Sequence, residues 1–211
     1  MQTSFKGNLF IITAASGAGK SSLIKSLIND YSNLMVSISH TTRPPRSGEK
    51  DGVDYFFVDE VEFHEMVRSG DFLEYAEVHG AFYGTSKSAV FAAMEKGQDL
   101  ILEIDYQGAL SVREIFEEAI SIFILPPSMR ALEDRLNFRG KDSKSNIKKR
   151  LAVAKHEMSH LDKFDYVIIN DDFEKALTDL EAIITSKPEA FFLKTKNQIT
   201  NFQSLIDTLK E

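Results

Sequence analysis

A run of small residues between a strand-like and a helix-like segment carries the clearest chemical signal in this sequence. The run comprises Ala14, Ala15, Ser16, Gly17, Ala18, Gly19, Lys20 and Ser21. Small residues let backbone N–H groups turn towards an anion, and a helix N-terminus adds donors and a positive dipole end. Lys20 can reach the β- and γ-phosphates of a nucleotide, and the Ser21 hydroxyl can bind Mg²⁺. The spacing predicts a phosphate-binding loop, with Ala14 standing where the strict motif has glycine.

The segments on either side of this run fit the same interpretation. Residues 9–13 form an apolar run typical of a strand buried on both faces, and residues 22–28 place apolar side chains at i and i+4. Strand, loop and helix in this order are the context that a phosphate loop requires. The alternative is an ordinary strand–turn–helix with a chance Gly-Lys pair. It would not explain why Gly17, Gly19, Lys20 and Ser21 all stand at the positions that the motif requires.

Two arginines lie in a proline-containing loop. Arg43 and Arg46 flank two consecutive prolines. Proline restricts the backbone, so guanidinium groups held here can make paired, charge-assisted contacts to a phosphate. The hydroxyls of Tyr55 and Tyr83 would add donors for the same anion if the fold brings them close. The alternative is a pair of solvated surface charges.

Two carboxylates close an apolar run. Glu103 and Asp105 end the strand predicted at residues 100–105. The carboxyl ends of parallel strands line the ligand crevice of α/β sheets, and a carboxylate there typically orients Mg²⁺ and its waters. The alternative is that these carboxylates cap the helix that begins near Gly108.

A polar segment near residue 140 is rich in positive charge. Its cations are Arg135, Arg139, Lys141, Lys144 and Arg150. A basic flap of this kind could close over a triphosphate and stabilise the charge that develops in a transition state. A solvated basic loop is the alternative.

The sequence also contains the five-residue pattern of zinc peptidases. His156 and His160 flank Glu157 at the H-E-x-x-H spacing, so a helix would place both imidazoles on one face and Glu157 as a base. However, Lys163 stands where the extended motif needs glycine, no histidine follows His160, and the surrounding helix is strongly polar. A zinc peptidase is therefore the disfavoured alternative.

Composition and charge narrow the functional classes. The 211 residues suffice for one α/β domain with inserted parts, and the chain contains no cysteine. Disulfides and thiol catalysis are thereby excluded, and a cytoplasmic location is expected. The first residues do not resemble a signal peptide, and no apolar run approaches the ~18 residues of a membrane span. We therefore expect no membrane as a partner, and because the net charge is −7 we expect no nucleic acid either.

The order of the predicted elements indicates the fold class. Buried strands alternate with helices, which predicts an α/β fold with a parallel sheet and helices on both faces. Residues 34–85 break this rhythm with short alternating strands, the first at residues 34–39, and are interpreted as an inserted subdomain. Near the C-terminus, apolar residues at helical spacing predict a helix that packs on the core or on a second copy of the chain: Ile199, Phe202, Leu205 or Ile206, and Leu209.

Taken together, these features resemble the guanylate kinase family. The resemblance covers about residues 7 to 187, and it rests on residues 13–22, 39–49, 51–57, 72–76, 83–85, 103–108, 126–128, 139–140 and 167–172. It implies a P-loop NTPase-type fold and transfer of the γ-phosphoryl group of ATP to GMP, and also to dGMP, with Mg²⁺. A non-catalytic binding module of this family is the rival, but such modules lose the loop lysine, and Lys20 is present.

The resemblance also implies roles for single residues. GMP would be held by Ser39, Arg43, Arg46, Glu49, Tyr55, Glu74, Tyr83, Thr85 and Asp105. ATP would be held by the loop from Ala14 to Ser21 and by Asn170, and the metal ion by Ser21, Glu103 and Asp105. The catalytic set would be Lys20, Arg43, Arg135, Arg139 and Arg150. Many family members have aspartate where this chain has Glu103.

The resemblance further implies three parts and leaves the C-terminal residues outside them. The nucleotide-binding core would comprise residues 1–33, 86–127 and 162–188, the GMP-binding insertion residues 34–85, and the lid residues 128–161. The extension of residues 189–211 lies beyond the usual end of the family and makes a homodimer possible.

Overall fold

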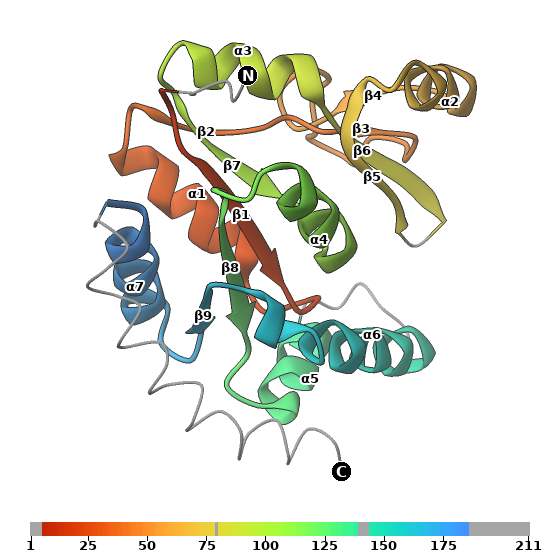
Figure 1. The fold of residues 1–211 in the computed structure, drawn as a ribbon. Helices are drawn as coiled ribbons and strands as arrows, with labels where there is room; N and C mark the ends of the chain where they lie inside the picture. Colours follow the sequence, from red (N-terminus) through yellow and green to blue (C-terminus); the bar gives the residue numbers. More distant parts are fainter. Residues whose placement is uncertain (1–5, 79, 139–143, 186–211) are drawn as a thin grey trace. The chain divides into compact units, whose positions relative to one another are not determined.

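The computed structural model describes residues 6–78, 80–138 and 144–185 (Figure 1). The strands are β1 (Leu9–Ala14), β2 (Leu34–Val36), β3 (His40–Thr41), β4 (Phe56–Phe57), β5 (Phe72–Val78), β6 (Ala81–Ser86), β7 (Asp99–Glu103), β8 (Ile120–Leu125) and β9 (Tyr166–Ile169). The helices are α1 (Lys20–Asp30), α2 (Glu60–Ser69), α3 (Lys87–Glu95), α4 (Tyr106–Ile115), α5 (Met129–Phe138), α6 (Lys144–Met158), the 3₁₀ turn η1 (Leu161–Lys163) and α7 (Phe173–Thr185).

The first sheet has five strands in the order β2-β7-β1-β8-β9. β2 runs parallel to β7, and β8 runs parallel to β9 with Ile122 opposite Tyr166. Ile11 and Ile12 in β1 and Phe123 in β8 have no exposed surface. Burial on both faces explains the continuous apolar runs, because neither face of these strands meets water. The predicted α/β class with a parallel sheet is confirmed.

The second sheet has four strands in the order β4-β3-β6-β5. β6 pairs antiparallel with both β3 and β5. The strand predicted at residues 34–39 is wrong in its extent, since β2 ends at Val36 and the second sheet begins with β3 at His40. The Ser37 N–H still donates to the Ile101 carbonyl, after which the chain leaves the first sheet. The extent of the insertion, residues 34–85, stays a prediction.

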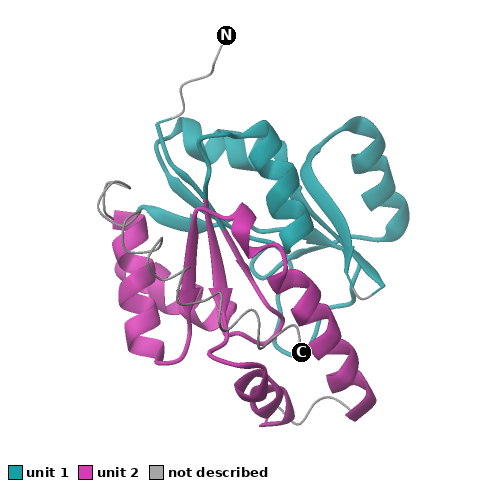
Figure 2. Ribbon diagram, turned by 60° about the horizontal axis from the view of Figure 1, so that its bottom comes forward, with its two compact units in different colours: residues 1–11, 32–120 teal, residues 12–31, 121–211 magenta. Residues whose placement is uncertain are grey.

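The chain forms two compact units, which Figure 2 colours separately. Unit 1 comprises residues 1–11 and 32–120, and unit 2 comprises residues 12–31 and 121–211. The residues implied in GMP binding all belong to unit 1, whereas the phosphate loop and the implied lid arginines belong to unit 2.

Side chains at the helix ends explain where several helices begin. The Asp59 carboxylate accepts from the Glu62 N–H at α2, and the Ser86 hydroxyl accepts from the Ala89 N–H at α3. The Ser128 hydroxyl caps α5 by accepting from the Ala131 N–H at 3.0 Å. These bonds satisfy backbone donors that have no partner inside the helix.

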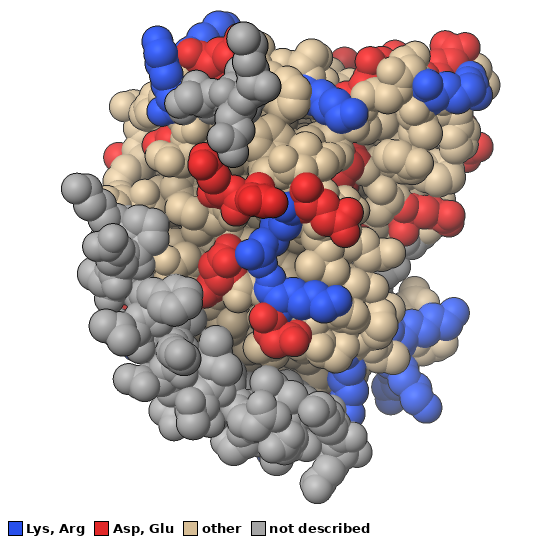
Figure 3. All heavy atoms as spheres, viewed as in Figure 1, with Lys and Arg blue, Asp and Glu red and all other residues tan. Residues whose placement is uncertain are grey.

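Among the described helices, none combines the length and the apolar character that crossing a bilayer needs. On the face that Figure 3 shows, the described acidic and basic side chains lie interspersed with one another.

Candidate active site

The phosphate loop adopts a conformation that requires glycine at two positions. Gly17 and Gly19 have φ values of 101° and 100°. A Cβ atom on Gly17 would lie 2.9 Å from Leu132 of α5, and one on Gly19 would collide with Nδ2 of Asn170. Both glycines therefore supply backbone freedom and space. Ala14 is instead the last residue of β1, where extended backbone accepts alanine without strain.

Replacing Gly19 with alanine should lower both stability and ATP binding. The substitution costs about 1–2 kcal/mol for the left-handed backbone alone, and it also displaces the buried Asn170 side chain from its bond to the loop. The control is Gly70→Ala, which has a φ of 70° but no atom within 4 Å of the added Cβ. Urea unfolding should show a larger loss for the Gly19 variant, and only that variant should bind ATP more weakly. Equal losses in both variants would contradict the steric account.

Helix α1 presents its N-terminus at the end of the loop. Its N-cap residue is Gly19, which has no side chain to serve as a cap, and its first internal bond joins the Leu23 N–H to the Gly19 carbonyl at 3.2 Å. The N–H groups before Leu23 thus lie at the positive end of the helix dipole. Lys20 and Ser21 are the first two residues of this helix, so both predicted ligands stand where an anion is favoured.

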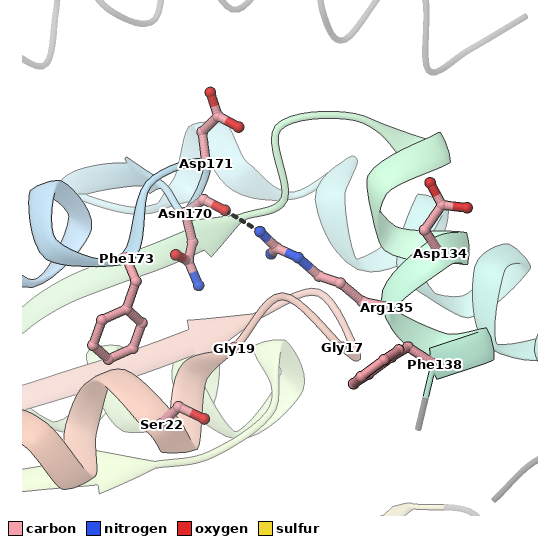
Figure 4. A pocket seen from close by; sticks show the side chains of 9 residues that line it. All are labelled: Gly17, Gly19, Ser22, Asp134, Arg135, Phe138, Asn170, Asp171 and Phe173. Carbon is pink, nitrogen blue, oxygen red and sulfur yellow. Dashed lines mark hydrogen bonds between the residues drawn. The ribbon is translucent and has the colours of Figure 1, made fainter. Parts of the chain in front are cut away.

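Two side chains of unit 2 hold the Ala18 carbonyl. Asn170 Nδ2 donates to it at 2.7 Å, and Arg135 Nη1 donates to it at 3.3 Å. Arg135 also reaches from α5 to the Asn170 carbonyl, where Nη2 donates at 2.6 Å (Figure 4). Asn170 follows β9 directly, so the end of a buried strand fixes the loop. In the structure, Arg135 and Asn170 therefore shape the loop.

A pocket of about 560 Å³ lies beside the loop in unit 2 (Figure 4). Its lining residues are Gly17, Gly19, Ser22, Asp134, Arg135, Phe138, Asn170, Asp171 and Phe173. The side chain of Phe138 is almost fully exposed, with 94% of its surface accessible. Two aromatic rings beside a phosphate loop suit a nucleoside. The sequence analysis missed Phe138 and Phe173, because nothing in their spacing distinguishes them from core aromatics.

A buried carboxylate forms the centre of the candidate guanine site in unit 1. Glu74 is only 6% exposed, and its Oε1 accepts from the Thr85 hydroxyl. The two residues face each other across the β5–β6 pair. A Cβ on Gly108 would lie 2.6 Å from Glu74 Oε2, so the absent side chain lets α4 approach the carboxylate closely. The positive end of α4 favours the charge on Glu74.

Arg43 is held by a carboxylate from its own loop. Its Nη2 donates to both carboxylate oxygens of Glu49, at 2.9 and 3.0 Å. Burial alone would lower the pKa of Arg43, but the bonds to Glu49 and Tyr83 outweigh it, so the pKa is raised. The guanidinium carbon also lies 5.3 Å from the centre of the Tyr55 ring. The structure thus brings the predicted arginine and both predicted tyrosines together.

The carboxylate of Glu49 is the centre of the turn. Burial favours its protonated form, but the Arg46 N–H, which donates at 2.7 Å, and the Arg43 guanidinium lower its pKa. Glu49 therefore remains ionised and fixes both arginine positions of the loop. The side chain of Arg46 is exposed, and Ser39 lies just before β3.

The two carboxylates predicted at one strand end differ in their surroundings. Glu103 ends β7, and its charge contributes to the raised pKa of Tyr55, of which burial is the larger cause. Asp105 is the N-cap of α4, and its Oδ1 accepts from the Gly108 N–H at 2.8 Å. For Asp105, the structure shows the helix cap that the sequence analysis gave as the alternative. The strand ends at Glu103, two residues earlier than predicted, so Asp105 lies between β7 and α4.

Known proteins share both the sequence and the fold of this chain. The guanylate kinase family model matches residues 6–187. The chain belongs to the guanylate kinase family. A guanylate kinase of Methylobacillus flagellatus is 56% identical over 97% of this chain and 99% of the relative, and one of Vibrio parahaemolyticus is 50% identical over 97% and 98%. The crystal structure of a guanylate kinase from Anaplasma phagocytophilum has a TM-score of 0.71 at 36% identity and covers 86% of each chain.

In this guanylate kinase, the glutamate of the H-E-x-x-H pattern binds the backbone of the phosphate loop. Oε2 of Glu157 accepts from the Ser16 N–H at 3.0 Å, and Nδ1 of His160 lies 3.0 Å from the His156 carbonyl. Within residues 6–78, 80–138 and 144–185, no group of three or more potential metal ligands occurs. The match to guanylate kinases and the bond from Ser16 to Glu157 favour the kinase over the zinc peptidase alternative.

Two of the three predicted lid arginines, Arg135 and Arg150, lie among the described residues, and the third does not. Arg150 on α6 donates from Nη2 to the Ser16 hydroxyl oxygen at 2.9 Å. Arg139 lies outside the described residues, as do Lys141 and the extension from residue 189 onward. The roles assigned to these residues by analogy with guanylate kinases stay predictions.

Proposed function

We propose that this guanylate kinase transfers the γ-phosphoryl group of ATP to the phosphate of GMP, or more slowly of dGMP, giving ADP and the nucleoside diphosphate. The observation that carries the choice of acceptor is the buried Glu74 carboxylate beside Thr85 and Gly108. Guanine offers two adjacent donors, N1–H and the 2-amino group, which one carboxylate can accept together. The test is ADP release that depends on GMP. ADP release that is the same without GMP would refute the proposal.

The phosphates of ATP would bind at the N-terminus of α1. Lys20 and the loop N–H groups supply the positive charge, and Gly17 and Gly19 keep side chains away from the anion. Arg135 and Arg150 already bond to the loop. Because a guanidinium has five N–H donors, each arginine can hold the loop and contact phosphate at the same time. Arg139 would act with them.

The phosphate of GMP would bind in the Arg43 cluster. Arg43, Arg46, Tyr55 and Tyr83 supply donors, and Ser39 would donate to O6 of guanine. Glu49 repels a phosphate, so its proposed role is to orient Arg43 through the bonds that Nη2 of Arg43 donates to both carboxylate oxygens. This role differs from the direct GMP contact that the resemblance implies.

The reaction needs little covalent chemistry from the protein. A phosphate oxygen of GMP is already anionic at neutral pH, so no general base has to remove a proton. Catalysis therefore rests on bringing two polyanions together and neutralising their charge. Exclusion of water would protect ATP from hydrolysis during the transfer.

The residues proposed for Mg²⁺ have suitable chemistry. Ser21, Glu103 and Asp105 all offer oxygen, the ligand that Mg²⁺ prefers, and kinases complete the coordination with nucleotide phosphates. The Gly108 N–H holds the Asp105 carboxylate in one orientation. When bound, Mg²⁺ neutralises part of the charge on the phosphates. We further propose a cytoplasmic location, because the chain contains no cysteine, as is common in a reducing compartment.

The C-terminal extension is proposed to form a homodimer. The apolar spacing of Ile199, Phe202 and Leu209 gives a helix one apolar face, and the family match ends at residue 187. Light scattering should therefore give twice the chain mass for the full protein and a single chain mass after deletion of residues 189–211. A single chain mass for both proteins would rule out the dimer.

A further inference from the structure

Two side chains of helix α6 bind Ser16 of the phosphate loop, one at its backbone N–H and the other at its hydroxyl oxygen. The Glu157 carboxylate accepts from the Ser16 N–H at 3.0 Å. The Arg150 guanidinium donates to the Ser16 hydroxyl oxygen from Nη2 at 2.9 Å and from Nε at 3.3 Å. Arg150 and Glu157 are seven residues apart, which places them on the same face of the helix. A single face of α6 therefore fixes both the backbone and the side chain of Ser16.

We infer that Glu157 is a positioning residue for the phosphate loop and that it sets the affinity for ATP by accepting the Ser16 N–H. This inference rests on the proposed function. Ser16 lies before the first residue of α1, so its N–H is not part of the hydrogen bonds within that helix. Its neighbours Ala15 and Ala18 are each only 1% exposed, and the Ala18 N–H turns back to the Ala15 carbonyl at 2.9 Å. A rotated Ser16 peptide would disturb this buried turn.

The negative charge of Glu157 is unfavourable next to a loop that binds phosphate. A carboxylate beside an anion-binding loop repels phosphate, and Arg150 on the same face offsets that charge at the position where both residues contact Ser16. We therefore assign the Glu157 carboxylate the role of hydrogen-bond acceptor for the Ser16 N–H, a role that depends on the length of its side chain. The opposite role would be competition, in which Glu157 stands in for a phosphate oxygen and leaves when ATP binds.

Two conservative variants separate reach from charge. Glu157→Gln keeps the length and an acceptor oxygen but removes the charge, whereas Glu157→Asp keeps the charge but shortens the side chain by one methylene. Asp162→Asn is the control, because Asp162 is an exposed acid in η1, next to the C-terminal end of α6. All three proteins are compared with wild type in KM for ATP, KM for GMP and kcat, and in calorimetric ATP binding without GMP.

If Glu157 is a positioning residue, the length of its side chain, and not its charge, should determine the affinity for ATP. Glu157→Asp should weaken ATP binding and raise KM for ATP about tenfold, since a hydrogen bond to a charged group is lost. Its KM for GMP should stay unchanged, which a general loss of folded protein would not produce. Glu157→Gln should keep nearly the wild-type KM for ATP, as should Asp162→Asn.

Three results would overturn the inference. Tighter ATP binding by Glu157→Gln would show competition. An unchanged KM for ATP in Glu157→Asp would show that the Ser16 bond has no effect. Equal rises in the KM values for ATP and GMP would show a general structural effect. Wild-type protein that binds ATP but releases no ADP with GMP would refute the proposed function alone, because the calorimetric comparison of the variants would still stand.

Discussion

Replacing Lys20 with methionine should lower kcat by about a thousandfold and leave the fold intact. Lys20 is the first residue of α1 and is partly exposed, so methionine, which has nearly the same length and a good helix propensity, fits the position. The variant loses a positive charge next to the phosphates, where negative charge develops in the transition state.

The matched control is Lys25→Met. Lys25 lies on the same helix and is exposed, so this variant removes the same charge away from the loop. Steady-state kinetics measures kcat for each protein, and thermal unfolding checks that each is folded. A Lys20 variant with nearly wild-type kcat would sink the role assigned to this lysine.

Replacing Glu74 with glutamine should lower kcat/KM for GMP by about a hundredfold, the cost of a lost charged bond and a mismatched donor. In the structure, Oε1 of Glu74 accepts from Thr85. A glutamine that keeps this bond must turn its NH₂ group towards the N1–H and 2-amino donors of guanine. Donor then faces donor, although the shape of the site is unchanged.

Binding of ATP should change little in the Glu74 variant, since Glu74 belongs to unit 1 and the phosphate loop to unit 2. Glu77→Gln is the control, because Glu77 lies on the same strand but is exposed. The measurements are kcat/KM for GMP and for AMP and the affinity for ATP. Full preference for GMP in the Glu74 variant would show that another group selects the base.

Some parts of the fold can be predicted from the sequence because local chemistry determines them. The runs at β1 and β8 are apolar since both strand faces are buried, and Gly17 and Gly19 stand where φ is positive. The spacing of Lys20 and Ser21 after them indicates a phosphate site before any contact is known. The alternation at residues 34–39 misled because it continues past Val36, where pairing with β7 ends.

Other parts depend on contacts that no local pattern shows. Glu157 meets Ser16 across 141 positions of sequence, and its neighbourhood instead suggests a zinc motif. Glu49 is implied as a GMP ligand, yet its carboxylate is engaged by Arg43 in the same loop. The exposed ring of Phe138 is identified as a candidate binding residue only because the structure places it at the pocket beside the phosphate loop. Tertiary contact, and not residue type, decides each of these cases.

We propose that this chain phosphorylates GMP and selects guanine through Glu74. The most direct measurement is kcat/KM from coupled ADP release with GMP, dGMP, AMP, UMP and CMP, each with ATP and Mg²⁺. We predict that GMP is the best substrate, that dGMP follows, and that AMP is worse than GMP by about 10⁴-fold, because adenine presents a lone pair at N1 to a buried carboxylate. Wild-type protein that uses AMP as readily as GMP would contradict the account.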